Sequence, residues 1–143
     1  MTGAGPIVPA VLPEMALVSA GAVGGALLRF GASEFAKRRD CGPAAILALN
    51  IVGSFALGTL AGNGAARPVQ LCLGVGFCGA FTTFSTFSMD TLAMVKSGQV
   101  GRAAAYVVAS NLFSIGAAYA GYRFRLPHAV VSKLRMPPKM PGG

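Results

Sequence analysis

The sequence predicts an all-α integral membrane protein with four membrane-spanning helices. Of its 143 residues 54% are hydrophobic and only 11% are charged, whereas about a quarter of the residues of a soluble domain are charged. Four apolar runs, each of about 20 residues, match the ~30 Å thickness of a bilayer core. The spans must be helical because lipid offers no hydrogen-bond partner to a free amide.

The first two spans are bounded by charged or turn-forming segments. The first is expected at residues 15–35 and ends before the charged loop KRRD at 37–40. The second is expected to begin at Pro43, since proline is tolerated in the first turn of a helix, and to end at Ala61. GNGAARP at 62–68 then forms a turn.

The third and fourth spans complete the predicted bundle. We expect them at residues 69–95 and 103–122, with the turn KSGQVGR at 96–102 between them. Small residues recur at a spacing of four, which predicts close helix packing. These pairs are Gly21/Gly25, Gly58/Gly62 and Ala117/Gly121.

The chain therefore divides into three segments. Residues 1–14 form an N-terminal segment that is expected to be loose over residues 1–12. Residues 15–122 form the transmembrane domain. Residues 123–143 form a basic, Pro-rich tail that is expected to be disordered.

The composition argues against several functional classes. The net charge of +8 comes from basic residues at the ends of spans, where they face headgroups, so we expect membrane lipid and no nucleic acid as a partner. A single histidine and three cysteines without CxxC spacing exclude a transition-metal cluster within one subunit. The four acidic residues are scattered, whereas acid–base catalysis requires paired groups, so we expect no enzyme.

Basic residues are divided almost equally between the two sides of the membrane. Because a Lys/Arg excess normally sets orientation, this balance predicts insertion in both orientations and an antiparallel, dual-topology homodimer. A weakly biased chain oriented by other signals is the alternative. One side carries Arg67, Arg123, Arg125, Lys133, Arg135 and Lys139, and the other Lys37, Arg38, Arg39, Lys96 and Arg102, with Arg29 inside the first span.

The stretch GFCGAFTTFSTFS at 76–88 predicts a break of the third helix at mid-membrane. Glycine destabilises a helix by about 1 kcal/mol relative to alanine, and Ser and Thr compete for backbone hydrogen bonds. The two helix ends at a break present carbonyls to a cation and amides to an anion, so the stretch indicates an ion site. The alternative is a kinked packing helix whose hydroxyls bond to their own turn.

Aromatic and charged side chains near this stretch allow two interpretations each. Phe84 and Phe87 share one helix face, where they either present positive ring edges to a small anion or form an apolar pair. Arg29 lies near the end of the first span. It either extends to the headgroups or places a positive charge at a vestibule that concentrates anions.

Polar side chains within the spans indicate a pathway, because such groups are costly in lipid unless they are bonded. Asn50 lies in the middle of the second span. Tyr106, Ser110 and Ser114 follow one another at a spacing of four in the fourth span. The serines either line a pore or bond between helices.

With these motifs the chain resembles the small fluoride channels (Fluc/CrcB). The resemblance covers residues 17–122 and rests on GFCGAFTTFSTFSMD at 76–90, G-x-x-x-x-R at 24–29, N-x-x-G-S-F at 50–55 and the Tyr/Ser series. It implies a dual-topology homodimer with two pores in the cell (inner) membrane. Through them cytoplasmic fluoride leaves passively, which lowers fluoride toxicity.

The resemblance also implies residue roles. Phe84 and Phe87 would be the aromatic pair of each pore, Asn50 its asparagine, Tyr106, Ser110 and Ser114 its hydroxyl track, and Thr86 part of its polar lining. The backbone carbonyls of Gly79 and Thr82, two per subunit, would ligate a structural Na+ on the dimer axis. The chain departs from the family at Ala80, usually glycine, and at Ile46, usually threonine.

Two other functions remain open. A small dual-topology multidrug or cation exporter would use Glu14 as its proton-coupled site. Glu14, however, lies at the outer edge of the hydrophobic run, and the chain has no tryptophan to stack on cationic drugs. A non-transporting assembly protein would need Phe84 and Phe87 only for stability.

Overall fold

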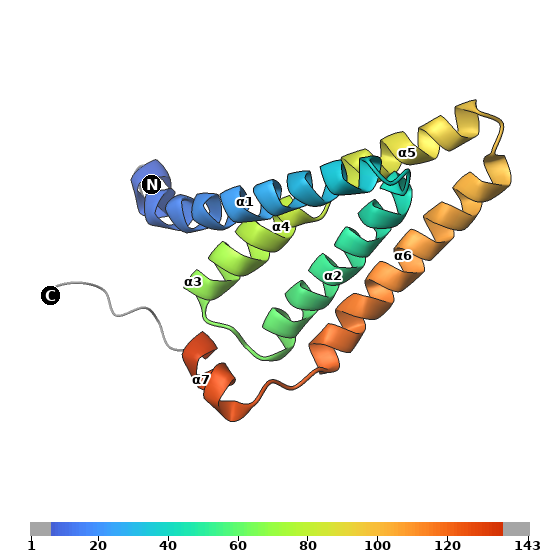
Figure 1. Ribbon diagram of the computed structural model, residues 1–143. Coiled ribbons are helices and arrows are strands. Elements are labelled where there is room, and N and C mark those ends of the chain that lie inside the picture. Colours follow the sequence, from blue (N-terminus) through green and yellow to red (C-terminus); the bar gives the residue numbers. More distant parts are fainter. Residues whose placement is uncertain (1–6, 136–143) are drawn as a thin grey trace, which may run out of the picture.

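The computed structural model describes the backbone of residues 7–135 and the side chains of residues 11–135. No strand occurs in this part of the chain. The elements in order are α1 (Ile7–Lys37), α2 (Gly42–Gly62), α3 (Arg67–Val69), η1 (Gln70–Cys78), α4 (Gly79–Phe81), α5 (Phe84–Lys96), α6 (Val100–Arg123) and α7 (His128–Arg135) (Figure 1).

Four helical segments are long and apolar enough to cross a membrane: Val11–Lys37, Gly42–Gly62, Arg67–Lys96 and Val100–Arg123. The prediction of an all-α protein with four spans is confirmed. The third segment comprises α3, η1, α4 and α5. Over η1 the helix is of the π type, which the sequence did not predict.

Both ends of the described chain are more ordered than the sequence indicated. The expectation that residues 1–12 are loose is wrong for residues 7–12, because α1 begins at Ile7 and continues through Pro13. The expectation of a disordered tail is wrong for His128–Arg135, which form α7. Tertiary contacts with the α2–α3 turn hold α7 in place, as described below. Residues 1–6 and 136–143 lie outside the described range.

Glycines bring α2 and α6 into backbone contact. A Cβ added at Gly58 would lie 2.1 Å from the carbonyl oxygen of Ala118, and one at Gly62 would lie 2.0 Å from that of Tyr122. From the other helix, a Cβ at Gly121 would lie 2.2 Å from the carbonyl oxygen of Phe55. Gly21 and Gly25 of α1 approach the third segment equally closely, so the predicted close packing is confirmed at these glycines.

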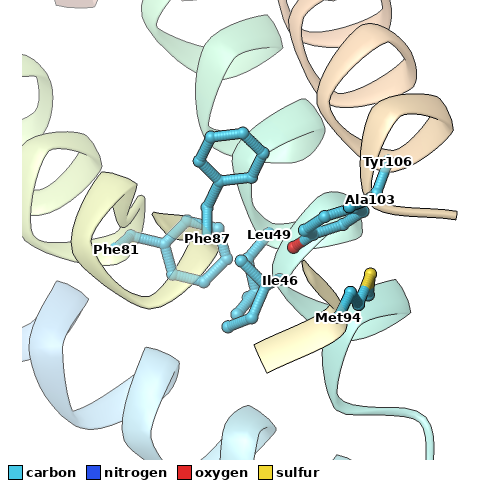
Figure 2. Packing of buried hydrophobic residues seen from close by; sticks show 7 residues of the cluster. All are labelled: Ile46, Leu49, Phe81, Phe87, Met94, Ala103 and Tyr106. Carbon is cyan, nitrogen blue, oxygen red and sulfur yellow. The ribbon is translucent and has the colours of Figure 1, made fainter. Parts of the chain in front are cut away.

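A small buried cluster lies between α2, the third segment and α6 (Figure 2). Most other large apolar side chains are exposed, among them Leu27, Leu112 and Ile115. A protein whose apolar side chains face outward in this way needs lipid or another chain to cover them. The cluster comprises Ile46, Leu49, Phe81, Phe87, Met94, Ala103 and Tyr106.

We expect Gly58→Ala to destabilise the protein, because its methyl group would force α2 and α6 apart. Overpacking of this kind typically lowers stability by about 1–3 kcal/mol, and we expect a loss in that range here. The measurement is the thermal midpoint of the purified protein in detergent, with the folded fraction at each temperature monitored by size-exclusion chromatography. Gly31→Ala is the matched control, since nothing lies within 4 Å of a Cβ at Gly31. Equal midpoints for the two variants would contradict the packing described here.

Candidate functional site

The helical path of the third segment is interrupted at two residues. Thr82 has φ −79° and ψ 158°, and Thr83 has φ −150° and ψ 115°, so both are extended. α4 ends immediately before them and α5 begins immediately after. Because extended residues leave the i→i−4 hydrogen-bond pattern, the backbone groups on both sides need other partners.

Asn50 of α2 supplies two of these partners with one side chain. Its Nδ2 donates to the carbonyl oxygen of Thr83 at 3.2 Å, and its Oδ1 accepts from the backbone N–H of Thr83 at 2.8 Å. An amide side chain carries one donor group and one acceptor, so it pairs with both backbone groups of a single extended residue. The side-chain amide of Asn50 therefore stabilises the interruption directly.

Thr83 is also the N-cap residue of α5. Its Oγ1 accepts from the backbone N–H of Thr86 at 3.2 Å, which is an N-cap interaction, and donates to Oγ1 of Thr86 at 3.1 Å. Thr83 is buried. Sequence reasoning gave this residue no individual role. The signal was present, because a threonine directly before a helical run is a preferred N-cap residue.

Arg29 of α1 contacts the end of the first helical half. Its Nε donates to the carbonyl oxygen of Ala80 at 3.0 Å. The amide that would bond this carbonyl in a continuous helix belongs to Phe84, beyond the interruption. A guanidinium at the C-terminal end of a helix is also favoured by the helix dipole. Neither of the roles that the sequence suggested for Arg29 included this contact.

A groove of about 510 Å³ runs along the interruption. It brings together most of the residues singled out in the sequence, and none of the side chains that line it is charged. Thr86, Tyr106 and Arg29 do not line it. The lining includes Asn50, Ser54, Gly79, Thr82, Thr83, Phe84, Phe87, Ser110, Asn111 and Ser114.

Three aromatic rings form a row that enters the bundle from this groove. The ring centroids of Phe84 and Phe87 are 5.5 Å apart, and those of Phe87 and Tyr106 are 5.2 Å apart, with tilted planes in both pairs. Phe87 is 7% exposed and packs with Tyr106 around α2 (Figure 2), whereas Phe84 is 77% exposed. The outer ring of the row is therefore mostly uncovered by the described residues.

Two hydroxyls of α6 are buried without a hydrogen-bond partner among the described residues. They are Oη of Tyr106 and Oγ of Ser110. A buried polar group without a partner typically costs about 1–3 kcal/mol, and such groups are rare in native structures. Ser114, one turn further along α6, is half-buried in the same groove. These O–H groups are available to an acceptor from outside the chain.

The backbone oxygens of Gly79 and Thr82 form a second set of available groups. Both residues line the groove. Among the hydrogen bonds of residues 7–135 that lie outside the regular helix pattern, none ends on either carbonyl oxygen. Between residues 11 and 135 no cluster of His, Cys, Asp and Glu has the arrangement of a metal site.

Glu14 lies apart from the groove. Its two carboxylate oxygens accept hydrogen bonds from Nε and a terminal nitrogen of Arg67, at 2.6 and 2.8 Å. The pair joins α1 to the start of the third segment. Glu14 thus has a structural partner.

Comparison with known proteins identifies relatives across the membrane-spanning part. A family model described as CrcB-like protein, Camphor Resistance (CrcB), matches residues 16–122. The fluoride-specific ion channel FluC 1 of Geobacillus kaustophilus is 41% identical over 106 residues, which cover 73% of this chain and 91% of that protein.

Two further relatives have similar names. FluC 1 of Streptomyces avermitilis is 42% identical over 114 residues, which cover 76% of this chain and 92% of that protein. FluC of Rhodospirillum centenum is 49% identical over 84 residues, which cover 55% of this chain and 67% of that protein. Since the family match extends from the first span to the fourth, the chain belongs to the CrcB-like family, as its motifs indicated.

Proposed function

We propose that this protein is a passive, fluoride-selective ion channel of the cell (inner) membrane that lets cytoplasmic fluoride leave and so lowers fluoride toxicity. Relatives that match most of the chain are named fluoride-specific ion channels. The observation that carries the proposal is the pair of buried hydroxyls of Tyr106 and Ser110, which have no hydrogen-bond partner within the described chain, and of which Ser110 lines the uncharged groove.

Fluoride entering this site would exchange water for hydroxyl donors. Burying an unpaired anion is very costly, but O–H groups that donate to an anion form short, strong hydrogen bonds. Ser110 and Ser114 are one helical turn apart on α6, so an ion that leaves one hydroxyl meets the next. The buried hydroxyls would gain the acceptor that the fold does not provide.

The aromatic row would contribute weak attraction. Ring edges carry partial positive charge, and Phe84 and Phe87 stand at the groove without a neighbouring lysine or arginine in its lining. Conduction requires binding that is strong enough for entry and weak enough for exit. Ring edges and hydroxyls meet both requirements better than a fixed cation, which would hold a small anion tightly.

We also propose that the pore is completed by a second copy in an antiparallel, dual-topology homodimer. The groove is open along one side, and Phe84 is largely uncovered. The almost equal division of Lys and Arg between the two ends of the bundle supports insertion in both orientations. Two-fold symmetry then gives two equivalent pores.

A structural Na+ at the dimer interface is the proposed cofactor. The carbonyl oxygens of Gly79 and Thr82 suit such an ion, because they are hard oxygen ligands and accept no hydrogen bond outside the regular helix pattern among residues 7–135. Gly79 lies in the last helical turn before the interruption and Thr82 is the C-cap residue of α4, where the helix dipole favours a cation. A bound Na+ would supply charge that holds these carbonyls together across the interface.

The alternative functions have less support. An exporter that uses Glu14 would need this carboxylate free to bind protons and cations, whereas it is paired with Arg67 outside the groove. An assembly protein would not need unpartnered hydroxyls in its core. Fluoride efflux from liposomes that hold the purified protein, with chloride as the control anion, tests the channel function directly.

Phe84→Ile is expected to lower fluoride efflux about tenfold, which corresponds to about 1.4 kcal/mol of activation free energy. The reason is that a branched aliphatic side chain has no positive edge. Because Phe84 is exposed within one chain, the thermal midpoint of a detergent-solubilised sample should change little. Efflux is measured with a fluoride electrode.

Phe30→Ile is the matched control for Phe84→Ile, since Phe30 is also exposed and lies on α1, outside the groove. It should conduct normally. If Phe84→Ile altered stability without altering efflux, the assembly function would be favoured over the channel.

Ser110→Ala should separate transport from stability. Loss of the hydroxyl removes a donor from the proposed pathway, so efflux should fall by about tenfold or more. The thermal midpoint should stay constant or rise, because an unpartnered buried hydroxyl is removed. Ser97→Ala, whose hydroxyl donates to the carbonyl of Met94 outside the groove, is the control. Normal efflux in Ser110→Ala would contradict the proposed pathway.

Replacing Na+ by a large organic cation should lower the thermal midpoint of the dimer, because bound ligand stabilises the folded state by mass action. The measurement is the fraction of dimer that survives heating in each salt, at equal ionic strength. An identical fraction in both salts would argue against the sodium site and leave the pore proposal untouched.

A further inference from the structure

The C-terminal helix α7 turns back against the end of the bundle where α2 ends and α3 begins (Figure 1). The carbonyl oxygen of Leu134 accepts from the backbone N–H of Ala66 at 2.7 Å. Val131 and Leu134 are half-buried, whereas Lys133 and Arg135 are exposed. The helix therefore has a side that faces the bundle and a basic side that faces outward.

Asn63, at the end of α2, holds this arrangement. It is only 3% exposed. Its Nδ2 donates to the carbonyl oxygen of Phe124 at 2.8 Å, and its Oδ1 accepts from the backbone N–H of Leu126 at 3.1 Å. The connection between α6 and α7 is thus fixed to the bundle by a buried side chain.

Two guanidinium groups converge on the same turn. Arg125 donates from a terminal nitrogen to the carbonyl oxygen of Gly62, and Nε of Arg135 donates to that of Asn63 at 3.3 Å. A guanidinium has five N–H donors, so each group keeps donors for an external partner. The acidic residue at this end, Glu14, is already bound by Arg67.

Charge and aromatic residues locate this turn at the level of the lipid headgroups. From Arg123 to Arg135 the sequence contains four Lys or Arg residues and no Asp or Glu. Tyr119 and Tyr122 at the end of α6 and its C-cap residue Phe124 are exposed. Exposed aromatic residues at the end of a span mark the membrane–water interface.

We propose that Arg125 and Arg135 bind the phosphate of an anionic phospholipid headgroup, with the charges of Arg123 and Lys133 adding to the attraction. Paired guanidinium groups recognise phosphate by multiple charge-assisted hydrogen bonds. A basic segment that follows the last span is attracted to the anionic lipids of the membrane surface. The family match ends at residue 122, so this site belongs to a segment beyond the shared transmembrane part.

The test uses the full-length protein with the substitution Tyr122→Trp. The chain has no other tryptophan, so its fluorescence reports one location. In liposomes of phosphatidylcholine and phosphatidylglycerol, brominated acyl chains are placed on one lipid at a time, and the quenching gives the relative affinity at that location. We expect several-fold preference for phosphatidylglycerol, which decreases in high salt because exposed charges are screened.

Removing charge should remove the preference. Arg123→Gln with Lys133→Gln changes side chains for which no hydrogen bond occurs in the described structure, so α7 keeps its contacts. The preference should fall by up to about fivefold for each basic side chain removed. Arg125→Gln with Arg135→Gln should abolish it.

The matched control is Arg38→Gln with Lys96→Gln, which removes two charges at the opposite end of the bundle. It should leave the preference at Trp-labelled position 122 unchanged. Equal quenching by the two lipids in the protein that carries only Tyr122→Trp would overturn the proposal. A lipid preference that survives both charge-removing pairs of substitutions would overturn it as well. Quenching is read without fluoride, so this outcome is independent of the channel function.

Discussion

The pairing of the Asn50 amide with both backbone groups of Thr83 is the interaction on which the site depends. In an apolar bundle each unsatisfied amide or carbonyl costs several kcal/mol. With Thr83 satisfied from α2, the third segment can run as two helical halves. Arg29 then binds the end of the first half, and the Thr83 hydroxyl caps the second.

Polar groups near the interruption fall into two kinds. Backbone groups of Ala80 and Thr83 have side-chain partners from α1 and α2. The hydroxyls of Tyr106 and Ser110 on α6 have none. One side of the groove is therefore fixed by internal hydrogen bonds, and the other keeps hydroxyls without a partner among the described residues. In the proposed channel, structural stability and ion binding would thus be assigned to different helices, although both border one groove.

Hydropathy alone was enough to predict the four spans, and glycine and hydroxyl content located the stretch that contains the two extended residues. The residues of the groove were found because polar side chains are rare within spans. Partners were not predictable: Asn50 and Thr83 are far apart in sequence, and their contact exists only after α2 and the third segment pack. α7 was missed because a helix of its length is unstable alone and depends on the turn around Asn63.

The backbone contact between α2 and α6 has a consequence for the width of any passage beside them. Asn50 and Ser110 stand on these two helices, and glycines hold the helices at the shortest distance that main chains allow. Main-chain contact is almost incompressible, unlike contact between flexible side chains. The separation of α2 and α6 at these glycines is thus set by the main chain, so a change of side chain at Asn50 or Ser110 would leave it unaltered.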